Sequence, residues 1–522
     1  VVDDYKYEIR LYNQADIGAK DAEGFYTVSG TPRETWTIEN PNQSDTDFSK
    51  TKMTQTLSSG VAYVFDWEYI EASKTWKVVS GGGLKITTQT KEWNSSRTEV
   101  TETLITKDAS DTVISKKVSH FTKYSFGLRK DSEIIDPDGA ALTTAYTYYT
   151  DEAETGKYGS KKSTLNPDGS WETYDYDAQG RMTVKVMSYK DAAFGADATS
   201  AKAMYFSYTS HDAADVPDAN DNRPRTVETK ILGTTVDKAY FVFKTVADQY
   251  IKIAETCSNP ANAYGDASNL KTTTTHYAET GVAPSAGRVE TIANSDGTLT
   301  SYTYELGTYS ASPTPGASTF TPGTGDAFRT TIVNGTTASP AGIANKTVKT
   351  VKVNDELGNR VLSETYAYDG SAYSRVAWTE RTYNDDHKII TNASSNNTSS
   401  SATWNCCSKD SETAADGTEY TYDYNLLKQM VTRTKKGAGS APDVVTSYTY
   451  DAEGRRLSQT TASGGLSLGT TSTYDVAGRM LTSTDVSGLV TTYAYTNGGR
   501  TVTVTSKGAT TISDRYTDGR PK

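Results

Sequence analysis

A short motif, Tyr-x-Tyr-Asp-x-x-Gly-Arg, recurs along this chain of 522 residues and constrains its fold more than any other feature. It reads YTYDAEGRRL at 448–457, TYDVAGRML at 473–481 and YDYDAQGRMT at 174–183. In the C-terminal part, its second tyrosine falls at Tyr422, Tyr450, Tyr474 and Tyr495, which are 28, 24 and 21 residues apart. A period of about 20–30 residues fits one β-hairpin per repeat. The residues of an active site would occur once in the sequence, so the repeated motif predicts a structural unit.

The motif divides into a strand, a turn and a return strand. Tyr448 and Tyr450 are two residues apart, so both rings lie on one face of a strand. Asp451 and Gly454 predict a turn, because Asp bonds nearby backbone N–H groups and Gly tolerates positive φ. Arg455 then opens the return strand. The predicted repeat residues are Tyr174, Tyr176, Asp177, Gly180, Arg181, Tyr302, Tyr304, Tyr420, Tyr422, Asp423, Tyr448, Tyr450, Asp451, Gly454, Arg455, Tyr474, Asp475, Gly478, Arg479, Tyr493, Tyr495, Gly499 and Arg500.

The spacing between the preceding turn and the tyrosines changes only in steps of two. A turn glycine stands five residues before the first tyrosine at 169–174, 297–302 and 488–493, three before it at 417–420, and seven before it at 139–146. Because a shift of one residue would send the rings to the opposite face, this parity predicts that the rings share one side and form a stacked layer. We expect the Asp/Arg pairs beside the turns to be exposed, each contributing about 0–1 kcal/mol.

The composition favours an extended all-β protein that buries tyrosine rings rather than aliphatic side chains. Only 35% of the residues are hydrophobic, against roughly 45–50% in typical domains, but there are 36 tyrosines. Tyr, Thr and Val favour strands. The net charge of −11 argues against a nucleic-acid partner, which needs a basic face. The chain contains no run of 18 apolar residues, so the sequence predicts no membrane span.

Three sequence features resemble reactive sites, but for each we prefer the interpretation as a loop without chemical function. GLSLG at 465–469 has the nucleophile-elbow pattern around Ser467, but we interpret it as a hairpin loop, because it lies in a Gly/Ser/Thr turn between two repeat units rather than between a strand and a helix. Asp218, Asn220 and Asn222 imitate the start of a calcium loop, with Asp215 and Asp221 nearby, yet Arg223 stands where Gly is needed. A solvated acidic loop is the preferred interpretation, with a weak calcium site as the alternative.

His387 is the third of these features. It stands beside Asp385 and Asp386, as a catalytic base stands beside the carboxylate that orients it, but no nucleophile is identifiable, and a surface loop is the preferred interpretation.

Cys257, Cys406 and Cys407 cannot form a disulfide framework, and we interpret them as small half-buried residues; a vicinal disulfide or a bridge to Cys257 is the alternative. We therefore expect no catalytic residues, no metal and no cofactor.

The repeated Tyr-x-Tyr-Asp-x-x-Gly-Arg units with Asp-Gly turns resemble the YD repeats of the RHS family, which includes bacterial RHS toxins, the shell component of insecticidal toxin complexes and teneurins. The match is strong at 168–181, 417–500 and 516–520, looser at 136–148, 296–304 and 366–370, and weak before residue 135. The resemblance implies a ribbon of stacked antiparallel β-hairpins that spirals into a shell or tube.

We expect two regions: a β-rich region of degenerate repeats at 1–135, with a separate small β domain as the alternative, and a YD-repeat array at 136–522 with loop insertions at 191–224 and 309–326. Neither end looks capped, so the array is expected to continue beyond 522 in a longer parent chain, or to pair head to tail with copies of itself.

The sequence is compatible with two functions. The first is a noncatalytic shell or scaffold segment of a large extracellular or cell-surface protein, with enclosed cargo as a partner. The second is an adhesin that uses exposed Tyr and Trp side chains to bind glycans. An enzyme is the least favoured interpretation.

Overall fold

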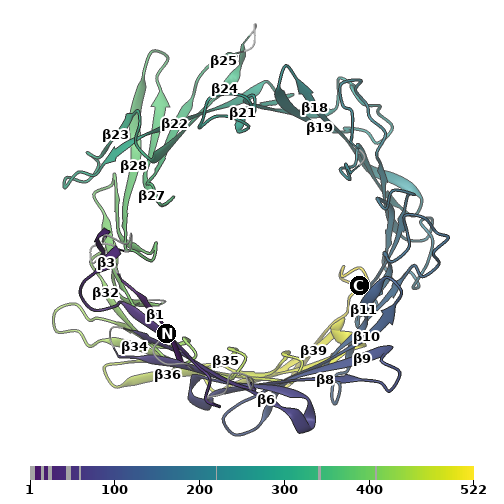
Figure 1. Ribbon diagram of the computed structural model, residues 1–522, viewed down its shortest axis with the longest axis vertical. Coiled ribbons are helices and arrows are strands. Elements are labelled where there is room, and N and C mark those ends of the chain that lie inside the picture. The colour runs from purple at the N-terminus through teal and green to yellow at the C-terminus, as the bar shows by residue number, and fades with distance from the viewer. Residues whose placement is uncertain are drawn as a thin grey trace. The chain divides into compact units, whose positions relative to one another are not determined.

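A computed structural model describes residues 6–12, 17–20, 26–42, 49–57, 60–218, 220–338, 342–405 and 408–522. Within these ranges the regular secondary structure is almost entirely β-strand, and 38 strands join one antiparallel sheet in which nearly every strand pairs with its neighbours in sequence (Figure 1). Strands β2 and β3 form a separate hairpin. The fold class predicted from the motif, an all-β array of antiparallel hairpins, is confirmed. Cys406 and Cys407 lie outside the described residues.

The strand boundaries follow the chain in order. The first strands are β1 (Lys6–Leu11), β2 (Ile17–Lys20), β3 (Tyr26–Val28), β4 (Glu34–Glu39), β5 (Lys50–Leu57), β6 (Ala62–Ile70), β7 (Thr75–Ser80), β8 (Lys85–Trp93), β9 (Glu99–Lys107), β10 (Val113–Tyr124), β11 (Gly127–Ile135), β12 (Leu142–Tyr148) and β13 (Lys161–Leu165). The next are β14 (Trp171–Tyr176), β15 (Met182–Met187), β16 (Lys202–Ser207), β17 (Thr226–Ile231), β18 (Thr234–Val246), β19 (Gln249–Thr256), β20 (Leu270–His276), β21 (Val289–Asn294), β22 (Thr298–Ser310), β23 (Thr319–Pro322), β24 (Ala327–Ala338), β25 (Gly342–Ala344), β26 (Val348–Asn354), β27 (Arg360–Tyr368), β28 (Tyr373–Tyr383), β29 (Ile389–Ser394) and β30 (Ser399–Trp404).

The last strands are β31 (Lys409–Thr413), β32 (Glu419–Tyr424), β33 (Met430–Lys435), β34 (Val444–Tyr450), β35 (Arg456–Ser463), β36 (Leu466–Tyr474), β37 (Met480–Thr484), β38 (Val490–Thr496), β39 (Thr501–Ser506) and β40 (Ala509–Ser513). Three single-turn 3₁₀ helices, η2 (Glu71–Ser73), η3 (Gly81–Gly83) and η4 (Asn497–Gly499), lie between strands. No helix in the described ranges is long and apolar enough to cross a membrane.

The chain divides into two compact lobes. Lobe 1 holds Val1–Glu152, Tyr158–Trp171 and Ala402–Lys522, and lobe 2 holds Ala153–Lys157 and Glu172–Ser401. Lobe 1 therefore groups the N-terminal strands, such as β6 and β8, with the C-terminal repeats, such as β35 and β39 (Figure 1).

Polar and ionic bonds connect the two parts of lobe 1. The Glu453 carboxylate accepts a bond from the Ser115 hydroxyl at 2.9 Å and lies 3.4 Å from Lys85 Nζ. Arg455 donates to the Ile114 carbonyl at 3.2 Å. These contacts tie β8 and β10 to a turn more than 300 residues later in the chain.

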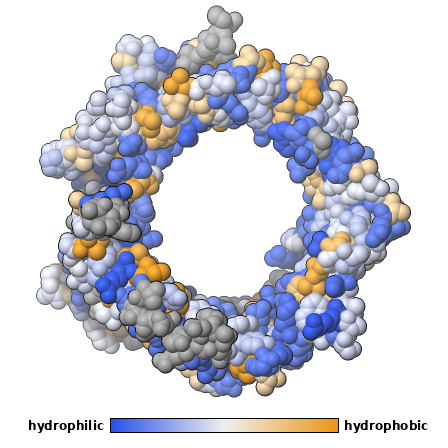
Figure 2. Space-filling view, in the orientation of Figure 1, coloured by the Kyte–Doolittle hydropathy of each residue, from blue (hydrophilic) through white to orange (hydrophobic). Residues whose placement is uncertain are grey.

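The apolar core is small, as the composition predicts. In lobe 2, Val351, Val353, Val361 and Leu362 form a buried cluster, and rings such as Tyr366 pack against it. Elsewhere hydrophilic and hydrophobic residues are interspersed on the visible surface (Figure 2). The sheet therefore depends on its ladder hydrogen bonds and on polar and aromatic contacts between neighbouring strands more than on one large core.

The two predicted insertions carry strands of their own. The range 191–224 contains β16, which pairs with β15 and β17, so its loop segments lie on either side of that strand. The range 309–326 contains β23, which pairs with the end of β22. Both ranges extend the sheet as well as decorating it.

Candidate functional site

The repeated motif builds the same turn each time. Asp451 Oδ1 accepts the backbone N–H groups of Glu453 at 3.0 Å and Arg455 at 2.9 Å, and Asp451 Oδ2 accepts Arg455 Nε at 2.6 Å. Gly454 has φ +83°, the left-handed conformation that closes a three-residue hairpin loop. Asp475 and Arg479 make the equivalent Oδ2–Nε contact at 2.7 Å.

The expectation that these Asp/Arg pairs are exposed is wrong. The Asp451 side chain is 5% exposed and its Arg455 partner 20%, and Asp475 is 14% exposed. The turns are covered because neighbouring turns and strands pack over them. In the first repeat, burial opposes ionisation of Asp177, but hydrogen bonds from Arg181 outweigh it and lower the pKa of this carboxyl.

The last tyrosine of each repeat bonds to the repeat before it. The Tyr450 hydroxyl donates to the Met430 carbonyl at 2.8 Å, and Tyr495 donates to Met480 at 2.8 Å. Each acceptor is the first residue of the return strand after the preceding turn. The same bond recurs at Tyr208–Met182, Tyr383–Arg360, Tyr424–Lys409 and Tyr474–Arg456. Burial raises the pKa of Tyr450 and Tyr495, so these phenols keep their protons at neutral pH.

The turn arginine reaches forward to the next tyrosine. Arg455 lies 5.1 Å from the ring centroid of Tyr474, and Arg479 lies 4.7 Å from that of Tyr495. Such cation–π contacts contribute about 0.5–2 kcal/mol each. The Arg181 guanidinium lies 4.2 Å from the Tyr208 ring. Each regular repeat thus makes three kinds of contact, which we together call the repeat lock: the Asp–Arg ion pair in the turn, the contact of the arginine with the next tyrosine ring, and the hydrogen bond from the tyrosine hydroxyl to the preceding repeat.

The repeat lock replaces the continuous ring stack that the parity suggested. Tyr448 and Tyr450 do share a face, with ring centroids 6.4 Å apart. In the described C-terminal repeats, however, rings of successive repeats are connected through hydroxyl groups and arginines. The tyrosines themselves lie in β14, β22, β32, β34, β36 and β38, as expected.

One repeat is shifted by two residues from the predicted alignment. The turn after β32 runs from Asn425 to Gln429, with the N–H of Asn425 bonded to the Gln429 carbonyl, so Asp423 lies in the strand and does not form the turn. The linking ring is Tyr424 rather than Tyr422. Asn425 takes the place of Asp, and Lys428, with φ +62°, takes the place of Gly. Sequence reasoning preferred the first Asp available, although an Asn at the right spacing would have indicated the true turn.

The loop at Gly499 and Arg500 also differs from the prediction. Thr496 pairs with Thr501 across a four-residue loop that contains η4, so the expected one-to-one match with Gly454 and Arg455 is wrong. Gly499 does take positive φ, at +95°. Arg500 donates to the Asp168 carbonyl at 3.3 Å, a contact within lobe 1.

His387 belongs to an additional repeat turn, at 384–388. Its φ of +59° places it where Gly454 stands in the regular motif. Its ring Nδ1 lies 2.8 Å from Oδ1 of Asn359, which ends the turn of the preceding repeat. The residue is therefore part of the repeat structure.

The prediction that Ser467 lies in a hairpin loop is wrong, because the residue lies inside strand β36, beside a two-residue turn formed by Gly464 and Gly465. A nucleophile elbow needs a strand followed by a helix, so the pattern match has no structural counterpart.

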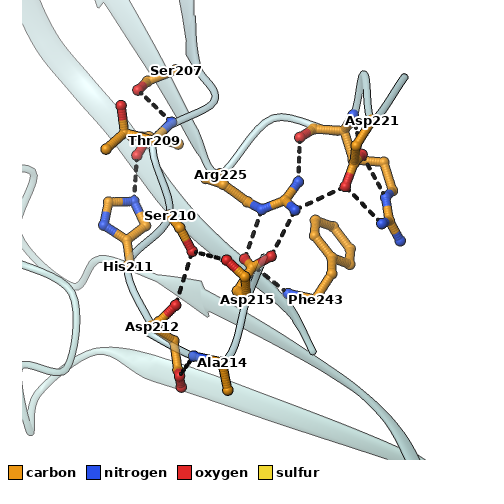
Figure 3. Close-up of polar contacts among 12 residues, drawn as sticks. Ser207, Thr209, Ser210, His211, Asp212, Ala214, Asp215, Asp221, Arg225 and Phe243 are labelled. Carbon is orange, nitrogen blue, oxygen red and sulfur yellow. Dashed lines mark hydrogen bonds and ion pairs between the residues drawn. The ribbon is translucent and has the colours of Figure 1, made fainter. Parts of the chain in front are cut away.

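Two carboxylates of the acidic insertion, Asp215 and Asp221, are buried, whereas Asp218, Asn220 and Asn222 are exposed, as expected for a solvated loop. Asp215 accepts two hydrogen bonds of 2.7 Å from the Arg225 guanidinium, and Asp221 accepts one of 2.8 Å from the same group. Figure 3 shows these bonds. The three side chains are 0–3% exposed. Arg223 also pairs with Asp221, and both arginines lie over the Phe243 ring. Asp215 and Asp221, two of the three carboxylates that resembled calcium ligands, serve as partners of arginine, which a list of acidic residues does not reveal.

Within the described ranges, no group of three or more His, Cys, Asp or Glu side chains has metal-site geometry. Cys257 is a half-buried free thiol, and burial raises its pKa. Asp218 caps its own loop by accepting the N–H of Asn220 at 2.7 Å.

The fold and the repeat lock define a β-hairpin repeat protein. Residues 474–511 match the family model of the RHS repeat. The chain therefore contains an RHS repeat, and the resemblance inferred from the motif is confirmed over this range. Comparison with curated proteins gives no match.

Several solved structures are similar over most of this chain. One is the crystal structure of TcdB2-TccC3, with 9% identity and a TM-score of 0.25, covering 99% of this chain and 38% of that one. Another is the Photorhabdus luminescens Tc holotoxin pore, with 10% identity and a TM-score of 0.25, covering 82% of this chain and 26% of that one. The chain thus spans well under half the length of these proteins.

Proposed function

We propose that this chain is a noncatalytic structural segment of a larger extracellular or cell-surface protein, and that its RHS-type sheet forms part of a shell or scaffold around a cargo. The observation that carries the proposal is the repeat lock. The carboxylate, guanidinium and phenol of each regular motif are bonded to one another or to the neighbouring repeat, so the motif's polar groups hold strands together.

The remaining candidates for chemistry support the same conclusion. His387 stands at a repeat turn and bonds to the turn before it, and Ser467 is a ladder residue beside a hairpin. Each lies within the repeat structure, His387 in a turn and Ser467 in a strand. For the organisation of the chain, we propose a β-rich region at 1–135 and a YD-repeat array at 136–522 that belongs to a longer parent chain, with head-to-tail copies as the alternative.

A glycan-binding adhesin remains the second candidate because aromatic side chains are exposed on the N-terminal strands. Trp76 on β7 is 44% exposed, and its ring centroid lies 5.0 Å from that of Tyr69 on β6. Paired exposed rings can stack on a sugar face, and Trp and Tyr are enriched at binding surfaces.

Single-particle imaging of the purified protein, combined with tryptophan fluorescence titrated with a panel of mono- and oligosaccharides, separates the two functions. We expect particles whose sheet encloses an internal volume, and no saturable fluorescence change. A saturable change that disappears in Trp76→Ala but persists in Trp93→Ala, which removes another exposed tryptophan from β8, would overturn the shell proposal in favour of the adhesin.

A further inference from the structure

A lysine, a glutamine and a glutamate meet inside lobe 1. Lys428, in the turn after β32, lies with Nζ 2.8 Å from Oε1 of Gln55 on β5. The Gln55 amide nitrogen Nε2 donates to Glu34 Oε2, on β4, at 2.5 Å. The Lys428 amine therefore reaches the carbonyl of a side-chain amide whose nitrogen is held by a carboxylate.

Two of these three groups are largely closed to water, and Lys428 is half-buried. Gln55 is 2% exposed and Glu34 is 9% exposed. The ring of Tyr63, itself 4% exposed, lies 4.6 Å from Lys428 Nζ. Burial lowers the pKa of Lys428, which raises the fraction of neutral amine. The neutral amine of a lysine is a nucleophile, and the burial of Gln55 protects its acyl centre from hydrolysis.

We propose that Lys428 and Gln55 join in an intramolecular isopeptide bond, an Nε-(γ-glutamyl)lysine cross-link, with release of ammonia. This covalent modification is independent of the proposed shell function.

The reaction balances without an oxidant or a co-reactant. Nζ of Lys428 forms a bond to Cδ of Gln55, and the Cδ–Nε2 bond breaks with its electron pair going to Nε2. Nζ loses two protons in all, and Nε2 gains both and leaves as ammonium. Glu34, which already accepts a hydrogen bond from Nε2, passes the protons and ends unchanged. It is the catalytic residue of this step because it touches the leaving group.

The bond would fasten β5 to a repeat turn 373 residues further along the chain. Like a disulfide that closes a long loop, it would restrict the unfolded chain strongly, and unlike a disulfide it would resist reduction.

Intact-mass spectrometry of the full-length protein tests the proposal. We expect a mass lower than that of the sequence by one ammonia molecule. Trypsin should fail to cleave after Lys428, and digestion should yield one branched peptide that contains both Gln55 and Lys428. Lys428→Arg and Glu34→Gln should both restore the full mass and remove the branched peptide.

Two matched variants serve as controls. Glu71→Gln and Lys74→Arg alter an exposed ion pair of the same residue types, and both should keep the mass deficit. A succinimide at an Asn-Gly step, such as Asn334-Gly335, also removes one ammonia but would persist in Lys428→Arg and give no branched peptide. A full-mass wild-type protein with cooperative thermal unfolding, or a deficit without the branched peptide, would overturn the proposal. A branched peptide that survives Glu34→Gln would remove Glu34 from the reaction.

Discussion

Replacing Arg225 by methionine is expected to destabilise lobe 2 by about 3–5 kcal/mol, because the substitution leaves two buried carboxylates without their shared cation. Asp215 and Asp221 are 0% and 3% exposed, and Arg225 supplies two bonds to one and one bond to the other. Denaturant unfolding followed by fluorescence measures the loss. Because the loop between β16 and β17 depends on this cluster, its amides should also lose protection from hydrogen exchange.

Arg223→Met is the matched control for this variant. Arg223 pairs with the same Asp221 and lies over the same Phe243 ring, but its side chain is 46% exposed. Its removal should cost much less, since Asp221 keeps Arg225 as a partner. Equal losses in the two variants would show that burial of the Asp215–Arg225 pair is not the source of the effect.

The same cluster predicts how stability changes with pH. Hydrogen bonds from Arg223, which outweigh burial, lower the pKa of Asp221 well below its ordinary value. A carboxyl with a lowered pKa in the folded state contributes stability above its unfolded pKa of about 3.9, and this contribution is lost as the pH falls further. The stability of lobe 2 should therefore decrease below about pH 4, and the decrease should be smaller in the Asp221→Asn variant, measured relative to its own value at pH 7.

The second large effect is expected for Asp451→Ala, which should destabilise lobe 1 by about 2–4 kcal/mol. The substitution removes the acceptor for two backbone N–H groups and for Arg455 Nε in a turn where the carboxylate is 5% exposed. Arg455 also donates hydrogen bonds to the Ile114 and Asp475 carbonyls, so its displacement should weaken the contact with β10 and with the following repeat. Thermal unfolding of the purified variant gives the magnitude.

Asp485→Ala separates the turn from the ion pair. Asp485 accepts the N–H groups of Ser487 and Leu489 in a comparable but exposed turn. Its loss should lower the unfolding temperature distinctly less than the loss of Asp451. If the two variants are equally destabilised, the buried Asp–Arg pair contributes nothing beyond the turn itself.

Local features of the fold could be predicted from the sequence because they depend on neighbouring residues. Alternation of Tyr, Thr and Val indicated the strands, and Gly454 and Gly478 indicated turns that need positive φ. The repeat at Asn425 was misplaced because Asn and a lysine with positive φ can replace Asp and Gly, and propensity alone gives such substitutes too little weight.

The contacts that explain the motif could not be predicted in the same way. The acceptor of the Tyr450 hydroxyl lies 20 residues upstream, and a bulge beside Tyr450 interrupts the register of its strand, β34, with the following strand, β35. One bulge changes which groups meet, so sequence spacing does not reveal the bond. Burial of the Asp215–Arg225 pair likewise depends on Phe243, a residue of β18 beyond the insertion itself.

Each repeat is fastened to the one before it through its last tyrosine, and hydrogen–deuterium exchange of Tyr450→Phe tests this most directly. The variant loses one hydrogen bond to the Met430 carbonyl but keeps the ring. We expect exchange of the amides in 425–433, in the preceding repeat, to rise by about two- to tenfold, the effect of losing roughly 0.5–1.5 kcal/mol. Exchange in 475–484, in the following repeat, should stay unchanged. An unchanged 425–433 segment, or an equal rise on both sides, would contradict the directional fastening of the repeats.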